Sequence, residues 1–204
     1  MDDGNLIGTI FLDLKKAFDT VDHFILCRKL HYYKISRQSV AWFKSYLSSR
    51  TQKIGIGNNI SNHEHVKQGV PQGSIFGTLL FILFINDLPL ENIKCNIDMY
   101  ADDEIERSLN EDLNTVNKWC IQNNMLINPT KTTCMLIGTT QRIATVTNEL
   151  NINLENQFIK NVNTQKLLGI YIDNNLDWKE QVDHICKNIN SRLFLLSKIK
   201  KYLD

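Results

Sequence analysis

The sequence lacks the paired cysteines of a zinc or redox motif. Its five cysteines are odd in number and widely spaced, and none forms a C-x-x-C pair. We therefore expect reduced thiols, most of them in the core, as in intracellular proteins. The chain also lacks an excess of charge, since 23 basic and 22 acidic residues leave a net charge of +1. Any nucleic-acid binding must therefore come from local patches rather than from a global basic field.

Membrane and export signals are missing as well. The most apolar stretch, Ile75 to Ile85, has eleven residues, which is short of the roughly 18 needed to cross a bilayer. The first residues, 1–4, provide neither a basic n-region nor a long apolar h-region. We expect an intracellular protein of the nucleus or cytoplasm, with no membrane partner. The sequence does not determine the oligomeric state. No repeat, low-complexity tract or linker interrupts the 204 residues, so one α+β core is sufficient.

Hydrophobic periodicity and turn residues predict the elements of this core. Ser74 is expected to cap a helix that Pro89 helps to end. Asn58-Asn59 is expected at the turn of a hairpin, and residues 139–147 as a polar loop. The helices are expected at 22–49 (two helices with a break near Ile35-Ser36), 74–88, 104–123 and 177–203. The strands are expected at 6–12, 51–57, 60–67, 94–100, 125–127, 133–137, 149–154, 156–160 and 165–172.

Acidic residues follow two of the predicted strands. Asp13 comes at the end of the first strand, and the pair Asp102-Asp103 comes directly after the strand that ends at Tyr100. Adjacent aspartates at a tight turn repel each other unless a cation compensates, and a pair of divalent metal ions does so in phosphoryl transfer. Hard oxygen ligands suit Mg²⁺. The alternative from the residues alone is a solvated turn or a helix cap.

The strings around these acids resemble motifs A, B and C of reverse transcriptases, in the same order. They are FLDLKKAFDTVDH at 11–23, QGVPQGS at 68–74 and YADD at 100–103. Further strings are similar to the non-LTR (jockey-like, LINE-type) retrotransposon branch, including its motif D and its primer-grip region, motif E. They are WFKSYL at 42–47, LLF at 79–81, INDLP at 85–89, LINPTKT at 126–132 and LLGI at 167–170.

The resemblance implies an α+β fold, RNA-directed DNA synthesis and a defined set of partners. The fold would be a reverse-transcriptase palm, an antiparallel sheet packed on helices, over 1–174, with the start of a helical thumb over 175–204. The fingers would be largely missing. The partners would be an RNA template, a DNA primer and deoxynucleoside triphosphates. A primer 3′-hydroxyl would attack the α-phosphate of a nucleotide, with charge neutralisation by two Mg²⁺ ions, or by Mn²⁺ as an alternative.

The resemblance also implies roles for individual residues. The metal ligands would be Asp13, Asp102, Asp103 and the carbonyl of Leu14. Lys131 would assist the departing pyrophosphate, although a lysine in this position is also typical of a solvated turn. Phe18 would select deoxynucleotides by a steric clash with a 2′-hydroxyl, with an ordinary core aromatic as the alternative. Gln72 and Gly73 would join Phe18 at the nucleotide. The primer and template contacts would be Gly69, Pro71, Tyr100, Leu168 and Gly169.

The sequence departs from the family pattern beside the aspartate pair. The family places a second apolar strand and a loop there, whereas Glu104 here begins the next helix immediately. Only twelve residues precede Asp13, and Thr78 replaces the usual proline. We therefore expect a truncated or mis-spliced relic whose isolated product polymerises poorly or not at all. The alternative function is a catalytically inactive fragment that binds nucleic acid or acts as an interaction module. The basic C-terminal helix suits either a thumb that tracks phosphates or a plain amphipathic helix.

Overall fold

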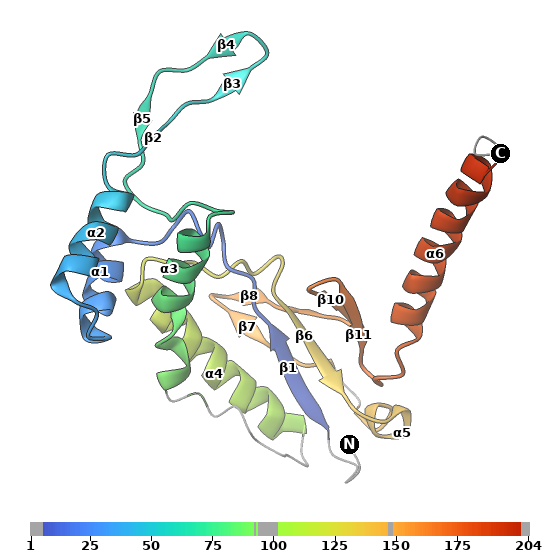
Figure 1. The fold of residues 1–204 in the computed structure, drawn as a ribbon. Helices are drawn as coiled ribbons and strands as arrows, with labels where there is room; N and C mark the ends of the chain where they lie inside the picture. The colour runs from blue at the N-terminus through green and yellow to red at the C-terminus, as the bar shows by residue number, and fades with distance from the viewer. Residues whose placement is uncertain (1–5, 92, 94–101, 147–148, 201–204) are drawn as a thin grey trace. The chain divides into compact units, whose positions relative to one another are not determined.

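The structure is a computed structural model that describes residues 6–91, 93, 102–146 and 149–200 (Figure 1). The side chains of residues 102–104 and 200 lie outside this description. The chain divides into two compact units. The first unit consists of Met1–Phe11, Asn96–Asn110 and Pro129–Asp204, and the second of Leu12–Cys95 and Glu111–Asn128. Helix α4 (Asp102–Gln122) contributes residues to both units.

The first unit contains a three-stranded sheet in the order β1-β6-β9. The strands are β1 (Ile7–Phe11), β6 (Thr133–Ile137) and β9 (Lys160–Asn161). Strand β1 runs antiparallel to β6, and β9 runs parallel to β6 at the edge (Figure 1). At Gly8 of β1, an added Cβ would lie 2.5 Å from Ile105 Cγ2 and 2.7 Å from Leu109 Cδ1 of α4. Glycine is therefore what lets this part of α4 pack closely on the strand.

Two hairpins and two further helices belong to the same unit. They are β7 (Asn153–Leu154) with β8 (Gln157–Phe158), β10 (Thr164–Leu167) with β11 (Ile170–Asp173), α5 (Thr140–Ile143) and α6 (Lys179–Lys200). The buried carboxylate of Asp173 accepts hydrogen bonds from the backbone N–H groups of Asp177 (2.9 Å) and Trp178 (2.8 Å). These bonds fix the turn that leads from β11 into α6. The core of this unit includes Leu6, Ile105, Cys134, Met135, Leu150, Ile152, Leu154 and Ile159.

The second unit is mainly helical. Its elements are α1 (His23–Tyr32), α2 (Arg37–Leu47), α3 (Ile75–Ile85), the 3₁₀ turn η1 (Leu88–Leu90) and the C-terminal half of α4. Asp22, Ser36 and Ser74 each accept a backbone N–H in the first turn of the helix that follows. Each fully buried leucine or phenylalanine stabilises the unit by about 1.5–3 kcal/mol. The core includes Leu26, Leu30, Val40, Leu47, Leu80, Phe84, Leu113, Trp119 and Met125.

A largely buried lysine ties α1 to the end of α3. The Lys29 ammonium donates to the Phe84 carbonyl and to Asp87 Oδ1, each at 2.7 Å. It also lies 4.6 Å from the ring centroids of Phe84 and Trp119. Burial lowers the pKa of Lys29 below its usual range, while the hydrogen bond and the charge of Asp87 oppose this change. The cation is thus compensated by a carboxylate, a carbonyl and two aromatic faces.

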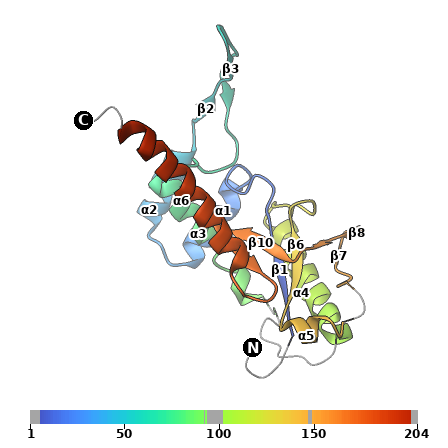
Figure 2. The same cartoon turned by 90° about the vertical axis from the view of Figure 1, so that its right-hand side faces the viewer.

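A long hairpin extends away from α1, α2 and α3 in this unit (Figure 2). Its paired segments are β2 (Thr51–Gln52) with β5 (Glu64–His65) and β3 (Gly55–Ile56) with β4 (Asn59–Ile60). Gly57 provides the positive φ of 59° at its turn. The hairpin is therefore as predicted, but its two turn residues are Gly57-Asn58 rather than Asn58-Asn59, because glycine adopts positive φ at the lowest cost.

The helix predictions are confirmed in type and order. Helices α1 and α2 lie within 22–49, and Ser36 at the predicted break caps α2. Helix α3 follows Ser74 as predicted but ends at Ile85, and Pro89 lies in η1. Helix α6 lies within the predicted range 177–203. The mixture of helices and small, mostly antiparallel sheets agrees with the predicted α+β class.

The strand predictions are correct at 6–12 and 133–137 and need correction elsewhere. Residues 165–172 were expected as one strand, but they form the β10–β11 hairpin, because Leu168 and Gly169 both have positive φ, at 50° and 92°. Residues 125–127 contribute only an isolated bridge, between Ile127 and Leu14. Pairing in 149–154 is limited to β7, and 156–160 is divided between β8 and β9. The strand predicted at 94–100 lies outside the described residues.

Three remaining expectations concern a loop, the thiols and the membrane. The predicted polar loop 139–147 contains α5, because Thr139 caps it by accepting from the Arg142 N–H. In the described part of the chain, Cys120 and Cys134 are buried free thiols, Cys27 is half-buried and Cys186 is exposed. No described helix combines the length and the apolar character that a bilayer span requires. The proposed boundary between palm and thumb, at 174/175, stays a prediction.

Candidate functional site

Two loops of the second unit that carry predicted site residues are joined through their backbones. We call residues 13–22 loop A and residues 68–74 loop B. The Val70 N–H donates to the Phe18 carbonyl at 2.7 Å, and the Gly69 N–H donates to the Val21 carbonyl at 2.8 Å. The Gly69 carbonyl accepts from Arg50 Nη1 at 3.3 Å and lies 2.8 Å from His23 Nε2. The structure therefore brings Phe18 and Gly69 together, although fifty residues of chain separate them.

Gly69 is the closest point of contact between the two loops. Its φ is +88°, and an added Cβ would lie 2.7 Å from the Asp19 carbonyl oxygen and 2.8 Å from Asp19 Cα. Any other side chain would therefore combine backbone strain with a clash against a backbone that cannot rotate away. Glycine thus permits a close backbone approach to loop A of the same chain, and the expected contact of Gly69 with primer or template stays a prediction.

Asp13 is held in an extended segment next to the predicted motif D string. The Asn128 N–H donates to the Asp13 carbonyl at 2.7 Å, and Asn128 Nδ2 donates to Asp13 Oδ2 at 3.2 Å. The Lys15 N–H donates to the Leu126 carbonyl at 2.8 Å. These two backbone bonds flank the Leu14–Ile127 bridge and use the carbonyls of Asp13 and Leu126. The Leu14 carbonyl, a predicted metal ligand, takes part in neither bond.

Phe18 lies at the contact between loop A and α3. Its ring stacks on Phe81 with centroids 4.5 Å apart and an interplanar angle of 24°. The side chain is half-buried. An offset stacked pair contributes about 0.5–1.5 kcal/mol beyond its buried area. Phe18 therefore has the packing role that was the alternative at the sequence level, and its role in nucleotide selection stays a prediction.

Loop B leads into α3 through a tight turn. Ser74 Oγ donates to the Pro71 carbonyl at 2.9 Å and accepts from the Gly77 N–H at 2.8 Å. A Cβ on Gly77 would lie 1.9 Å from the Pro71 carbonyl oxygen, so glycine is required there as well. Gln72 and Gly73 are exposed at the tip of the loop, and Gly73 has a φ of +82°. These two predicted nucleotide contacts are thus accessible to a ligand.

The aspartate pair has a different backbone from the one expected. Asp102 and Asp103 are the first two residues of α4, whereas the sequence predicted a tight turn after a strand. The helix begins early because Glu104 to Arg107 continue its pattern, and acidic residues favour the positive end of a helix dipole. The side chains of the pair, and all of Tyr100, lie outside the described residues. Among the described residues, no group of three or more His, Cys, Asp or Glu could hold a metal ion.

The remaining predicted residues lie in the first unit and are exposed. Lys131 precedes β6, and its side chain faces solvent. Leu168 and Gly169 form the tip of the β10–β11 hairpin, where Leu168 is 98% exposed. The predicted primer-grip residues are thus at a hairpin tip rather than in the middle of a strand.

Sequence reasoning missed the residues that hold these loops in place. His23 and Arg50 contact the Gly69 carbonyl, and Asn128 contacts Asp13 through both backbone and side chain. His23 and Asn128 both lie inside the recognised strings, at the end of motif A and within motif D. A polar residue at the edge of such a string was the available signal for an anchoring role.

Comparison with known proteins gives a family for almost the whole chain. A family model for reverse transcriptase (RNA-dependent DNA polymerase) matches residues 3–183. A probable RNA-directed DNA polymerase from transposon BS of Drosophila melanogaster is 31% identical over 201 residues. This alignment covers 86% of the chain and 21% of the relative.

Other relatives come from further mobile elements. The RNA-directed DNA polymerase from mobile element jockey of Drosophila funebris is 26% identical, over 91% of the chain and 22% of the relative. A retrovirus-related Pol polyprotein from the type-1 retrotransposable element R2 of Popillia japonica is 27% identical, over 42% of the chain and 14% of the relative. The chain spans about a fifth of the length of the transposon BS relative and of the jockey relative.

Proposed function

Because this chain belongs to the reverse transcriptase (RNA-dependent DNA polymerase) family of non-LTR retrotransposons, we propose that it carries the palm of an RNA-directed DNA polymerase. The reaction would join a deoxynucleotide to a primer 3′-hydroxyl under the direction of an RNA template, with release of pyrophosphate. The α+β fold is that of a palm-like fragment. The observation that most supports the proposal is the backbone pairing of loop A with loop B, from Val70 to Phe18 and from Gly69 to Val21.

In this proposal, each loop contributes a different kind of contact. Loop B would present Gln72 and the backbone of Gly73 to the nucleotide, since both are exposed. Phe18 would limit the space beside the sugar, because its stacking on Phe81 fixes the position of its ring. Gly69 and Pro71 would support the template, and Tyr100, Leu168 and Gly169 the primer or template. Lys131, with its exposed ammonium, would stabilise charge on the pyrophosphate.

The residues proposed to hold metal ions are Asp13, Asp102, Asp103 and the Leu14 carbonyl. The donor set fits Mg²⁺, or Mn²⁺ in its place, because all of these ligands offer oxygen. The Asp13 segment supports this choice for two reasons. Asn128 orients the Asp13 carboxylate, and the two backbone hydrogen bonds that flank the Leu14–Ile127 bridge do not use the Leu14 carbonyl. Bound Mg²⁺ would supply neutralisation of the charge that develops on the transferred phosphate.

Primer extension on poly(rA)/oligo(dT) tests the proposal. The expected result is Mg²⁺-dependent incorporation of thymidine nucleotides that falls at least about 100-fold in Asp13→Asn and in Asp102→Asn. Asp19→Asn is the matched control, because it makes the same charge change at an exposed position of loop A. Equal incorporation by Asp102→Asn and the unaltered chain would overturn the metal assignment.

A second candidate function is a catalytically silent module that binds nucleic acid. The observation in its favour is that α4 begins at Asp102, so that the aspartate pair has a helical backbone. Salt-sensitive RNA binding without any incorporation, unchanged in Asp102→Asn, would support this candidate. Incorporation that disappears in Asp102→Asn would exclude it.

A further inference from the structure

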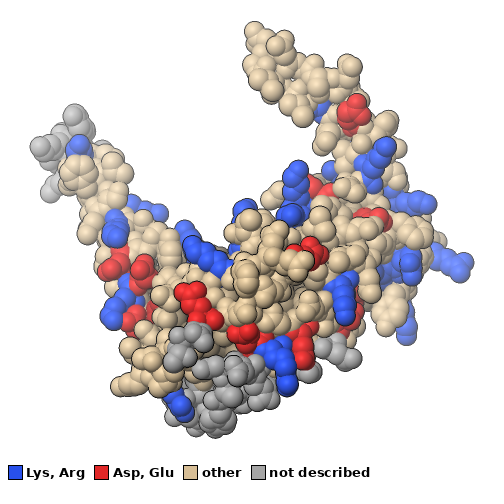
Figure 3. Space-filling view, turned by 180° about the vertical axis from the view of Figure 1, so that it is seen from behind, with Lys and Arg blue, Asp and Glu red and all other residues tan. Residues whose placement is uncertain are grey.

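The segment that forms α1 and α2 has a charge bias that the whole chain lacks. Residues 23–50 contain six Lys or Arg residues and no Asp or Glu, whereas the whole chain has 23 basic and 22 acidic residues. Lys and Arg side chains are correspondingly frequent on the surface that carries these helices (Figure 3). A local excess of cations attracts anions even when the net charge is close to zero.

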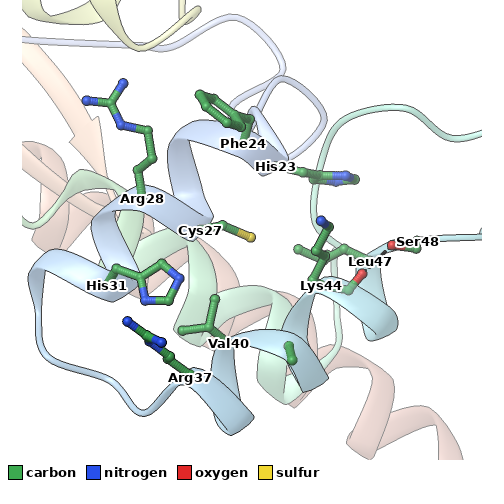
Figure 4. Close-up of a pocket in the computed structure, with 11 residues that line it drawn as sticks. His23, Phe24, Cys27, Arg28, His31, Arg37, Val40, Lys44, Leu47 and Ser48 are labelled. Atoms are coloured by element: carbon green, nitrogen blue, oxygen red, sulfur yellow. Dashed lines mark hydrogen bonds between the residues drawn. The ribbon is translucent and has the colours of Figure 1, made fainter.

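These helices line an open cavity of about 620 Å³ within the second unit (Figure 4). Its volume lies within the range of ordinary ligand sites, roughly 300–1,000 Å³. The eleven lining residues include no acid, and its apolar part includes Phe24, Val40 and Leu47. The cavity thus combines an apolar wall with a basic margin.

The basic side chains lie at both ends of the cavity. Figure 4 shows His31 and Arg37 at one end and His23 and Lys44 at the other, with the Cys27 thiol between them. Arg37 and Lys44 are exposed, and within the part of the chain that the structure describes no ion pair engages either of them. A ligand with more than one phosphate would therefore meet a cation at each end of the cavity without displacing a carboxylate.

An aromatic ring also lines the cavity, next to a further cation, Arg28. Phe24 is 72% exposed, and the guanidinium carbon of Arg28 lies 6.0 Å from its ring centroid. Both residues line the cavity. Alternation of basic groups with an exposed aromatic face is the chemistry by which proteins hold single-stranded nucleic acid, because phosphates bind the cations and bases stack on the ring. A compact inorganic anion would bind the cations without stacking on the exposed ring.

The cavity also connects to loop B. His23 lines the cavity, and its Nε2 lies 2.8 Å from the Gly69 carbonyl. An RNA strand that occupies the cavity would therefore run next to loop B, which is proposed to contact the template. This connection favours a nucleic-acid strand over a free nucleotide as the occupant.

We propose that the cavity between α1 and α2 binds single-stranded RNA, with one phosphate held by Arg37, a second phosphate held by Lys44 and a base stacked on Phe24. The proposal rests on the proposed function for the identity of the strand. It adds a contact with RNA on α1 and α2, outside loops A and B.

Fluorescence anisotropy of a 5′-labelled oligo(rU), measured with the full chain and without Mg²⁺ or nucleotides, tests the site. In the double variant Arg37→Gln, Lys44→Gln the affinity should fall roughly tenfold or more. The slope of log K against log salt should become shallower by roughly 1.4, which corresponds to two phosphate contacts on a single strand. Phe24→Ala should weaken binding roughly tenfold through loss of stacking, with little change in the salt slope.

The matched control is the double variant Lys53→Gln, Lys118→Gln. It removes the same charge from exposed positions of the same unit that do not line the cavity. Equal weakening in both double variants would show non-specific attraction and overturn the proposal. Competition by uridine monophosphate at an equal nucleotide concentration would assign the cavity to a free nucleotide and overturn the assignment to a strand.

Alkylation of Cys27 locates the ligand without any substitution. Mass spectrometry after treatment with iodoacetamide at alkaline pH should show that oligo(rU) slows modification of Cys27, which lines the cavity. Cys186, exposed on α6, serves as the internal control whose modification should not change. Unprotected Cys27 at saturating RNA would overturn the proposal. Neither measurement requires polymerisation. RNA binding at the cavity can therefore be tested even if primer extension fails.

Discussion

Two glycines of the candidate site have nearly the same backbone and different surroundings. Gly69 in loop B has a φ of +88°, and Gly169 at the tip of the β10–β11 hairpin has a φ of +92°. A Cβ on Gly69 would meet the Asp19 backbone at 2.7–2.9 Å, whereas a Cβ on Gly169 would meet no described atom within 4 Å. The first glycine is thus fixed by tertiary packing and the second only by its own turn.

The comparison separates two ways of presenting residues to a ligand. Loop B is held from several sides, by Val21, Phe18 and His23, so its tip can be positioned accurately. The hairpin tip presents Leu168 to solvent on two paired strands of four residues each. A site that positions reacting atoms needs the first arrangement, because rigid support reduces the cost of ordering the ligand.

Alanine at each glycine gives the largest expected contrast. Gly69→Ala should lower the free energy of unfolding by about 3 kcal/mol, since left-handed strain adds to overpacking. Gly169→Ala should lower it by about 1 kcal/mol, from strain alone. Urea titration followed by circular dichroism measures both. Similar losses in the two variants would contradict the assigned contact between Gly69 and Asp19.

Alkaline pH should destabilise both units through one buried thiol each. Burial raises the pKa of Cys120, in the second unit, and of Cys134, in the first, from 9.0 to about 11. A raised pKa means that the stabilisation is complete below the unfolded value and is lost as pH rises through the folded value. One unit of pKa corresponds to about 1.36 kcal/mol. The loss of unfolding free energy should therefore reach about 2–3 kcal/mol for each thiol. Unfolding free energies measured over this pH range test the expectation.

The alanine variants of the two cysteines assign this loss to a unit. Cys120→Ala should flatten the alkaline decline of the second unit and leave that of the first unchanged, and Cys134→Ala should do the reverse. Hydrogen exchange, read separately for α4 and β6, distinguishes the two. A decline that survives in both variants would show that other groups cause it.

One helix cap in each unit repeats the difference between the glycines. The cap in the second unit has a contact from a distant segment, whereas the cap in the first unit has a contact within its own turn. Asp22 accepts from the N–H groups of Phe24 (2.8 Å) and Ile25 (3.0 Å) and from Asn124 Nδ2 (3.1 Å). Thr139, which caps the short α5, accepts from the Arg142 N–H at 3.3 Å. Asp22→Ala should cost about 1–2 kcal/mol, and Thr139→Ala about 0.5 kcal/mol. Thermal unfolding measures both, and a larger loss in Thr139→Ala would reverse the comparison.

Acid pH sharpens the test at Asp22. Burial raises the pKa of this carboxyl, but the hydrogen bonds from Ile25, Asn124 and Phe24 outweigh it, so that the pKa lies below its usual range. The stabilisation is therefore present above the unfolded pKa and is lost as pH falls through the folded value. Asp22→Asn keeps a capping side chain and should abolish only this pH dependence. A pH dependence retained in Asp22→Asn would exclude Asp22 as its source.

The smallest expected effect is a gain in stability at the hairpin tip. Leu168 is 98% exposed and has a φ of +50° before Gly169 at +92°. Asn-Gly is the preferred pair where both turn residues have positive φ, so Leu168→Asn should stabilise the hairpin by about 0.5 kcal/mol. A melting temperature that rises while affinity for a primer–template falls would indicate that the leucine is retained for binding. Destabilisation by this change would contradict the turn geometry.

The local features of the fold were largely predictable from sequence. Strand β6 has the predicted bounds 133–137, and Ser36 and Ser74 cap the helices that follow them. The signals were strong because a short apolar run and N-cap chemistry depend on neighbours in the chain. The prediction failed at 165–172, where the turn is formed by Leu168-Gly169. An apolar leucine in that turn left the hydrophobic run unbroken and concealed the hairpin.

The candidate site was predictable as a set of residues but only partly as an arrangement. The motif strings identified Asp13, Phe18 and Gly69, but not the contacts that hold them. The aspartate pair was expected in a turn and lies at the start of α4, because the residues after Asp103 continue a helical pattern. Residues 23–50 carried a readable charge bias, which the balanced total concealed.

By itself, the sequence determined the longer helices, the Ser74 cap and the family. The tertiary structure decided that Gly69 faces the Asp19 backbone and that Asn128, 115 residues after Asp13, orients its carboxylate. The reason is physical. Backbone conformation responds to adjacent residues, whereas a contact between distant segments exists only when the folded core compensates the entropy of closing the loop between them.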